Sequence, residues 1–130
     1  MAIQTWLNGP CELSARSINA NVMSGMIGTY ALGVLAEGNV LAVRYVGRSD
    51  DDLAGRLQSW TGNPRYTHFL FGYLFSAEEA FKKECRLFHD FGATAILDNA
   101  VHPDRPNGSN VACPVCPPMG LAGFLGLGYR

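Results

Sequence analysis

The chain has 130 residues, which is enough for one domain with a hydrophobic core. A hydrophobic content of 48% with 16% charged residues excludes a disordered or fibrous protein. The net charge of −1 excludes the overall basic field of many nucleic-acid binders, so phosphate binding would need a local cluster. Neither a signal peptide nor an apolar run of about 18 residues is evident, which predicts a cytoplasmic protein without a membrane partner. In that compartment the four cysteines favour thiols or metal ligands over disulfides.

The first half of the chain predicts a hairpin followed by a short helix. Residues 1–25 give weak signals beyond a turn at Asn8-Gly9-Pro10, and we treat them as an N-terminal arm of undetermined structure. Residues 30–35 and 40–46 are rich in β-branched and apolar side chains and flank Gly38-Asn39, which predicts two paired strands. Residues 49–52 offer N-cap side chains for a helix that continues through Trp60.

The second half begins with a short aromatic strand, residues 68–75, and a well-marked helix over residues 76–91. Ser76 and Glu79 have the spacing of a capping box at the helix start. Glu84 interrupts the apolar stripe of this helix. Inside a core its carboxylate must be paired, bind a metal or line a cleft, whereas at the stripe's edge it would be partly exposed; the helix alone leaves both possibilities open.

The chain turns irregular beyond Leu97, and five of its seven prolines fall within residues 103–118. Residues 119–130 alternate glycine with apolar side chains, as in a disordered tail or a packed extension. The order of elements predicts an α+β fold with a small, mostly antiparallel, three-stranded sheet flanked by helices. We expect one domain over residues 26–118, in which residues 99–118 form an irregular C-terminal lobe.

Several short motifs occur in a recognisable order. Gly28-Thr29-Tyr30 opens the first predicted strand, and Tyr45-Val46-Gly47 closes the second. Arg56 follows on the first helix, Glu84 on the second, and Asn99 comes beyond it. In this order the set resembles the GIY-YIG nuclease family, and the resemblance covers residues 26–106, most of the chain.

The resemblance implies an endonuclease that hydrolyses DNA phosphodiester bonds with one Mg²⁺ or Mn²⁺ ion. It implies that Tyr30 acts as general base on the attacking water and that Tyr45 positions water or phosphate. Arg56 would hold the scissile phosphate, and Glu84 would be the only protein ligand of the ion. A carboxylate ligand suits these hard cations, but a tyrosine is a weak base at neutral pH unless nearby cations favour its phenolate.

The resemblance also implies supporting residues. Arg48 stands where the family often has a basic residue near the phosphate, and Asn99 would steady the site by hydrogen bonding. Many relatives have His or Tyr one helical turn after the arginine, where this chain has Trp60, whose indole N–H can only donate. His68 would compensate as a phosphate-site residue if the third strand brings it close.

A second metal site is indicated by the sequence itself. Cys85 and His89 lie one turn apart on the helix, and Cys113 and Cys116 form a CxxC knuckle, which together predict a structural Zn²⁺ site. Two alternatives stay open: a redox-active CxxC pair, and a histidine that only favours the helix dipole. Cys11 would remain a thiol outside the site.

Two other functions fit the same residues. One is a nucleic-acid-binding module on this fold that does not cut, because Trp60 replaces the usual side chain. The other is a zinc-stabilised interaction protein with no nucleic-acid role. For the nuclease the expected partner is DNA, with RNA and a specificity-giving protein partner left open, as are strandedness, sequence preference and biological role.

Overall fold

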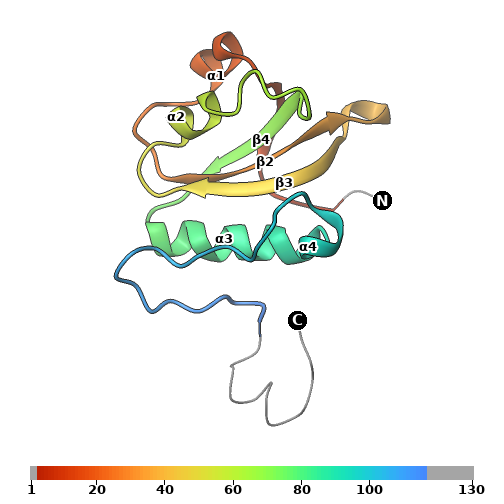
Figure 1. Cartoon of the computed structure of the whole chain (residues 1–130). Helices are drawn as coiled ribbons and strands as arrows, with labels where there is room; N and C mark the ends of the chain where they lie inside the picture. Colours follow the sequence, from red (N-terminus) through yellow and green to blue (C-terminus); the bar gives the residue numbers. More distant parts are fainter. Residues whose placement is uncertain (1–2, 117–130) are drawn as a thin grey trace.

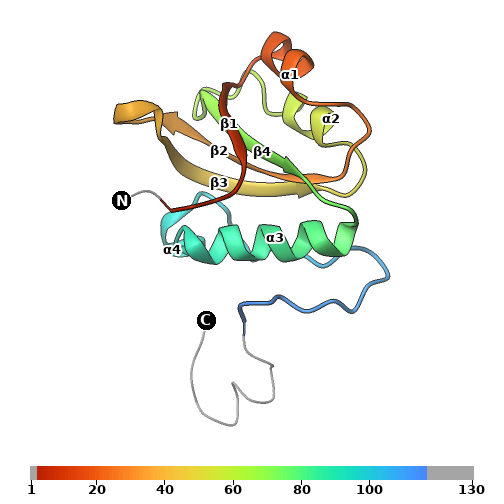
Figure 2. The ribbon, with the colours of Figure 1, turned by 180° about the vertical axis from the view of Figure 1, so that it is seen from behind.

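Four antiparallel strands form the central sheet in the order β1-β4-β2-β3. The structure is a computed structural model that describes residues 3–116, so Pro117, Pro118 and the predicted tail at 119–130 lie outside the described residues. The strands are β1 (Asn8–Glu12), β2 (Gly28–Leu35), β3 (Leu41–Ser49) and β4 (His68–Tyr73). The helices are α1 (Ala15–Asn21) and α2 (Leu53–Gln58) on one face, and α3 (Ala77–Asp90) and α4 (Ala93–Ile96) on the other (Figures 1 and 2).

The predicted α+β class and antiparallel sheet are confirmed, but the sheet has a fourth strand, β1. Its residues pair with β4 at Cys11–Phe69 and Glu12–His68. Asn8-Gly9-Pro10 has the composition of a turn, and a strand containing proline is tolerated only where no ladder hydrogen bond is lost. The edge position of β1 meets that condition, and the long-range pairing overrides the local turn signal.

The predicted hairpin joins β2 to β3 through a single 3-10 turn, η1 (Glu37–Asn39). Gly38 and Asn39 both have positive φ, 75° and 59°, which is the conformation that these two residue types tolerate best. After β3, helix α2 is shorter than predicted. It ends at Gln58, and Trp60 lies in the turn that follows it.

Helix α3 begins and ends as the sequence predicts. The Ser76 hydroxyl accepts a hydrogen bond from the backbone N–H of Glu79 at 3.1 Å, and Gly92, at φ 99°, ends the helix. Helix α3 buries Ala80, Phe81, Glu84, Cys85, Leu87 and Phe88. Glu84 is only 7% exposed, so it is a buried carboxylate and not a residue at the stripe's edge.

Alternate residues of β2 belong to two different cores. Tyr30 and Leu32 pack toward α1 and α2, whereas Ala31 packs on the other side with Leu87 and Phe88 of α3. This alternation is the two-residue period of a strand buried on both faces. The Tyr30 side chain therefore lies on the face of the sheet covered by α1 and α2, whereas Glu84 belongs to α3 on the opposite face.

The C-terminal lobe is irregular over residues 99–116, as predicted, and contacts first β3 and then α3. The backbone N–H of Asp98 donates to the carbonyl of Arg44 on the outer edge of β3 at 2.6 Å. The chain then passes along the side of α3 that faces away from the sheet (Figures 1 and 2). Within residues 3–116 no helix has the length and apolar character needed to cross a membrane.

Candidate active site and metal centre

A polar cavity of about 510 Å³ lies at the edge strand β3. It gathers five residues that the sequence singles out: Tyr30, Tyr45, Arg48, Arg56 and Glu84. They come from β2, β3, α2 and α3, so side chains from separate parts of the chain meet in one place. The remaining lining residues are Gly47, Ser49, Asp50 and Asp51.

Gly47 allows the cavity to bridge the two faces of the sheet. It stands directly opposite Tyr30 in the β2–β3 ladder. A Cβ atom at this position would overlap the Tyr30 hydroxyl and ring, so the tyrosine occupies the space that any other residue would fill. The glycine of the Tyr45-Val46-Gly47 motif thus has a direct steric reason.

Tyr30 lies deep in the cavity wall, only 2% exposed, with its ring stacked 6.4 Å from that of Tyr45. The Trp60 indole Nε1–H donates to the Tyr30 hydroxyl oxygen at 2.8 Å. Burial raises the pKa of Tyr30 well above its usual value, and the Trp60 hydrogen bond opposes that shift. Burial also raises the pKa of Tyr45. Neither phenol ionises readily without further cationic help.

Arg48 links two carboxylates at the floor of the cavity. Its Nη1 donates to Glu84 Oε1 at 2.7 Å, and its Nε donates to Asp50 Oδ1, also at 2.7 Å. The guanidinium lies 5.4 Å from the centre of the Phe81 ring. Burial raises the pKa of Glu84 to about 6, and the hydrogen bond and charge of Arg48 only partly counter this effect. Arg48 therefore lines the cavity, with its guanidinium bonded to two carboxylates.

Arg56 is the exposed cation of the cavity. It lies in the last turn of α2, whereas the Arg48 side chain is only 12% exposed. An exposed guanidinium beside buried polar groups is suited to bind a phosphate from solvent.

Asn99 braces the strand that carries the cavity. Its Nδ2 donates to the Val46 carbonyl at 2.8 Å, and its Oδ1 accepts from the Val46 N–H at 3.0 Å. These two bonds satisfy the outward-facing peptide groups of the edge strand two residues before Arg48. The steadying role expected for Asn99 thus has a defined geometry.

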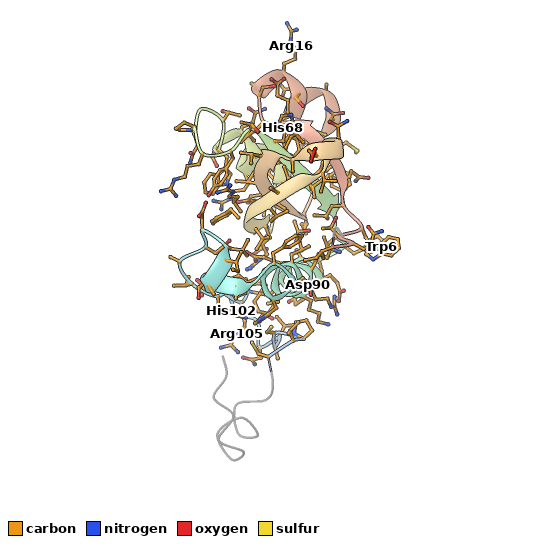
Figure 3. All side chains as sticks on the ribbon, turned by 90° about the vertical axis from the view of Figure 1, so that its right-hand side faces the viewer. Trp6, Arg16, His68, Asp90, His102 and Arg105 are labelled. Atoms are coloured by element: carbon orange, nitrogen blue, oxygen red, sulfur yellow. The ribbon has the colours of Figure 1, made fainter. Side chains whose placement is uncertain are left out.

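His68 is not brought to the cavity. It sits at the start of β4 opposite Glu12, three residues before Phe71, which is the partner of Tyr30. Its Nδ1 contacts the hydroxyl of Thr67 at 2.9 Å. Figure 3 shows His68 toward the α1 side of the molecule. The expectation that His68 supports the phosphate site is wrong, because β4 directs its other end toward the cavity.

A second group of side chains could hold a metal ion on the far side of α3. It consists of His89, His102, Cys113 and Cys116, whose ligand atoms all lie within 4.8 Å of one another. The two histidine Nε2 atoms are 3.3 Å apart, and the Cys116 sulfur lies 3.3 Å and 3.6 Å from them. Tetrahedral bonds of about 2.0–2.1 Å to nitrogen and 2.3 Å to sulfur give nitrogen–nitrogen and nitrogen–sulfur separations of about 3.3–3.6 Å, so the spacing of these three atoms fits one ion.

The predicted ligand set is corrected at one position, where His102 takes the place of Cys85. The imidazole Nδ1 of His102 lies 2.8 Å from the Pro103 carbonyl, which can only accept, so the proton is on Nδ1 and Nε2 is left for a metal. Cys85 is fully buried under the lobe and hydrogen-bonds to Cys113. The sequence offered His102 only as a single histidine in an irregular segment, without the spacing of a ligand pair.

The thiols of Cys113 and Cys85 differ in how readily they ionise. Although burial raises the pKa of Cys113, hydrogen bonds from the backbone N–H groups of Cys116 and Val115 lower it to about 7. Burial raises the pKa of Cys85, and its hydrogen bond to Cys113 adds to that shift. Cys113 is thus the better thiolate ligand, and Cys85 is its hydrogen-bond partner. Cys11 lies apart, on β1.

Comparisons with known proteins found no match to any protein-family model, curated protein or solved structure. The resemblance to GIY-YIG nucleases therefore rests on the ordered motifs of this chain.

We expect Asn99→Asp to lower the free energy of unfolding by about 2–4 kcal/mol, because a carboxylate would face the Val46 carbonyl and the donor would be lost. Urea denaturation measures the change. The exposed Asn107→Asp is the matched control and should stay within about 0.5 kcal/mol of wild type. Equal stability of the two variants would contradict the bracing role.

Glu84 should make stability fall as the pH rises. Its pKa is raised from 4.5 in the unfolded chain to about 6, so well below pH 4.5 the residue is neutral in both states and carries no penalty. Relative to Glu84→Gln, the wild type should lose about 2 kcal/mol of unfolding free energy in total, beginning about one pH unit below 4.5 and complete about one pH unit above 6.

Urea titrations of both proteins at several pH values test this difference, with the exposed Glu37→Gln as control. A difference between Glu84→Gln and wild type that does not vary with pH would show that Glu84 ionises like a solvent-exposed carboxylate.

Proposed function

We propose that the protein is a divalent-metal-dependent endonuclease that hydrolyses DNA phosphodiester bonds at the β3 cavity, in the manner of the GIY-YIG enzymes it resembles. The observation that carries the proposal is the lining of this single cavity by Tyr30, Tyr45, Arg48, Arg56 and Glu84. Their residue types match the needs of phosphodiester hydrolysis: a base, cations for phosphate oxygens and a carboxylate for a metal.

Glu84 is the residue that would hold Mg²⁺ or Mn²⁺. Its carboxylate is the most buried acidic group of the cavity, and Asp50 and Asp51 add oxygen atoms and negative charge nearby. This donor set is made of oxygens, as hard divalent cations prefer. A bound ion would supply charge stabilisation to the phosphate and acidify a water molecule.

Arg56 binds the scissile phosphate from the exposed side of the cavity, where its guanidinium can pair with two oxygens. Tyr45 orients the attacking water or a phosphate oxygen. Tyr30, as phenolate, accepts one proton from that water while the water oxygen bonds to phosphorus. The ester oxygen then leaves with the electron pair of the broken bond and takes a proton from solvent. Arg48 keeps Glu84 in place through Oε1.

Cleavage of DNA should depend on Arg56 and Glu84. With Mg²⁺ or Mn²⁺ and single-stranded, duplex and branched DNA, we expect Glu84→Ala to abolish metal-dependent cleavage. Arg56→Ala should reduce kcat/KM by about 100-fold or more, because a transition-state contact to phosphate is lost. Arg44→Ala, an exposed arginine of β3 outside the cavity lining, is the charge-matched control and should cleave normally.

The same experiment separates the alternatives. Wild-type protein that binds DNA but never cuts it would indicate a binding module, and cleavage that survives in Glu84→Ala would overturn the site. Phosphate contacts require binding to weaken as salt rises, so salt-independent binding or no binding would favour an interaction protein.

We further propose that the ion held by His89, His102, Cys113 and Cys116 is structural zinc. Two thiolates and two imidazoles are a ligand set typical of closed tetrahedral zinc sites. The lobe at 99–116 has no helix or strand of its own, so a bound ion would add stability that its small core lacks.

Zinc content should distinguish the ligand set from its neighbour. We expect about one zinc per chain in wild type and in Cys85→Ala, and a loss of most zinc in His102→Ala and Cys113→Ser. Elemental analysis of purified protein measures this, and Co²⁺ substitution should give the spectrum of a tetrahedral site with two thiolates. Zinc retained by His102→Ala but lost from Cys85→Ala would restore the set predicted from sequence.

A further inference from the structure

Trp60 stands where many GIY-YIG nucleases have His or Tyr, and in this structure it contacts Tyr30 directly. Its indole Nε1 lies 2.8 Å from the Tyr30 hydroxyl oxygen. An indole N–H can donate but cannot accept, so Tyr30 must be the acceptor in this bond. The proton of the Tyr30 hydroxyl must therefore point elsewhere, and one lone pair of its oxygen is permanently engaged.

The position of Trp60 is fixed by packing on both sides. Its ring lies 4.7 Å from the ring of Tyr45, and the Tyr66 ring stands edge-on to it at 5.7 Å. The Tyr66 hydroxyl donates to Asp98 Oδ2 at 2.8 Å, which anchors this aromatic group to the segment after α4. Because rings packed in this way have few rotamers, the N–H is held on the Tyr30 oxygen before any substrate binds.

A donor at this oxygen favours the phenolate over the phenol. The group is deeply buried, and the hydrogen bond from Trp60 is the only direct one to its hydroxyl within the described residues. The charged and titratable groups that line the cavity with Tyr30 are Tyr45 and Arg48 on β3, Asp50 and Asp51 after it, Arg56 on α2 and Glu84 on α3. Of the two cations, Arg48 is bonded to Glu84 and Asp50, and Arg56 lies at the exposed side of the cavity.

We propose that Trp60 is a positioning residue for Tyr30: its N–H orients the hydroxyl and stabilises the phenolate that takes the proton of the attacking water. The inference rests on the proposed nuclease function. It explains how a residue that cannot relay protons itself can stand beside the base. Trp60 leaves proton transfer to Tyr30 and supplies part of the positive potential that the buried phenolate needs.

Trp60→Phe removes the N–H and keeps an aromatic ring. At neutral pH we expect kcat on a DNA substrate with saturating Mg²⁺ or Mn²⁺ to fall about 10- to 100-fold with little change in KM, because a hydrogen bond to a charged group is lost. The alkaline rise of the pH–rate profile should move up by about one pH unit. Trp60→His, whose imidazole can donate, should recover part of the rate and of the profile.

Trp6→Phe is the matched control, since it makes the same change at a tryptophan that is 81% exposed and lies outside the cavity lining; its pH–rate profile should coincide with that of wild type. Thermal denaturation of each variant confirms that it is folded at the assay temperature. If Trp60→Phe cleaves with the same rate and pH profile as wild type, the proposed role of Trp60 is wrong, but the nuclease function stands. No cleavage by the wild type would overturn the proposed function itself.

Discussion

The buried ion pair between Arg48 and Glu84 is the interaction on which the arrangement of the cavity depends. A carboxylate in the apolar stripe of α3 would be very costly without a partner, and the cation bonded to it, Arg48, comes from β3. The pair therefore fixes how α3 lies against the sheet at this point. Burial still outweighs the attraction, as the raised pKa of Glu84 indicates. A buried carboxylate with a raised pKa in a polar cavity is a candidate for a functional residue.

The second constraint is the absence of a side chain at Gly47. The sheet separates Tyr30 from Glu84, since alternate residues of β2 and β3 face different layers. Only at the edge strand, where one residue has no Cβ, can the tyrosine hydroxyl reach the cavity that contains the carboxylate. The glycine and the ion pair therefore act together. Gly47 leaves room for Tyr30 on the α2 side of the sheet, and the bond from Arg48 holds Glu84 of α3 at the same edge. Trp60 then donates a hydrogen bond to the Tyr30 oxygen, so the hydroxyl proton of Tyr30 must point away from Trp60.

The sequence predicted the local features well because each has a short-range cause. The capping box at Ser76, the positive-φ turn at Gly38 and the buried stripe of α3 follow from residues close in the chain. The features that it missed depend on long-range contacts. β1 is a strand only because β4 offers it an edge, and His102 becomes a candidate ligand only because the irregular lobe passes α3. His68 was misplaced because composition does not tell which end of a strand faces a site.

Helix α3 supports both the cavity and the metal centre, but the two need not depend on one another. The segment after α4 runs beside β3 as far as Asn99. The Asn99 side chain makes two hydrogen bonds to Val46 of β3, and neither involves a candidate metal ligand. Leu97, just before it, is buried in the core between the sheet and α3. The edge of the cavity is therefore held by the protein's own contacts. A metal ion held by His102, Cys113 and Cys116 would act on the segment beyond Asn99, which has no helix or strand of its own as far as residue 116. Its free energy would then stabilise the lobe and leave the geometry of the cavity largely unchanged.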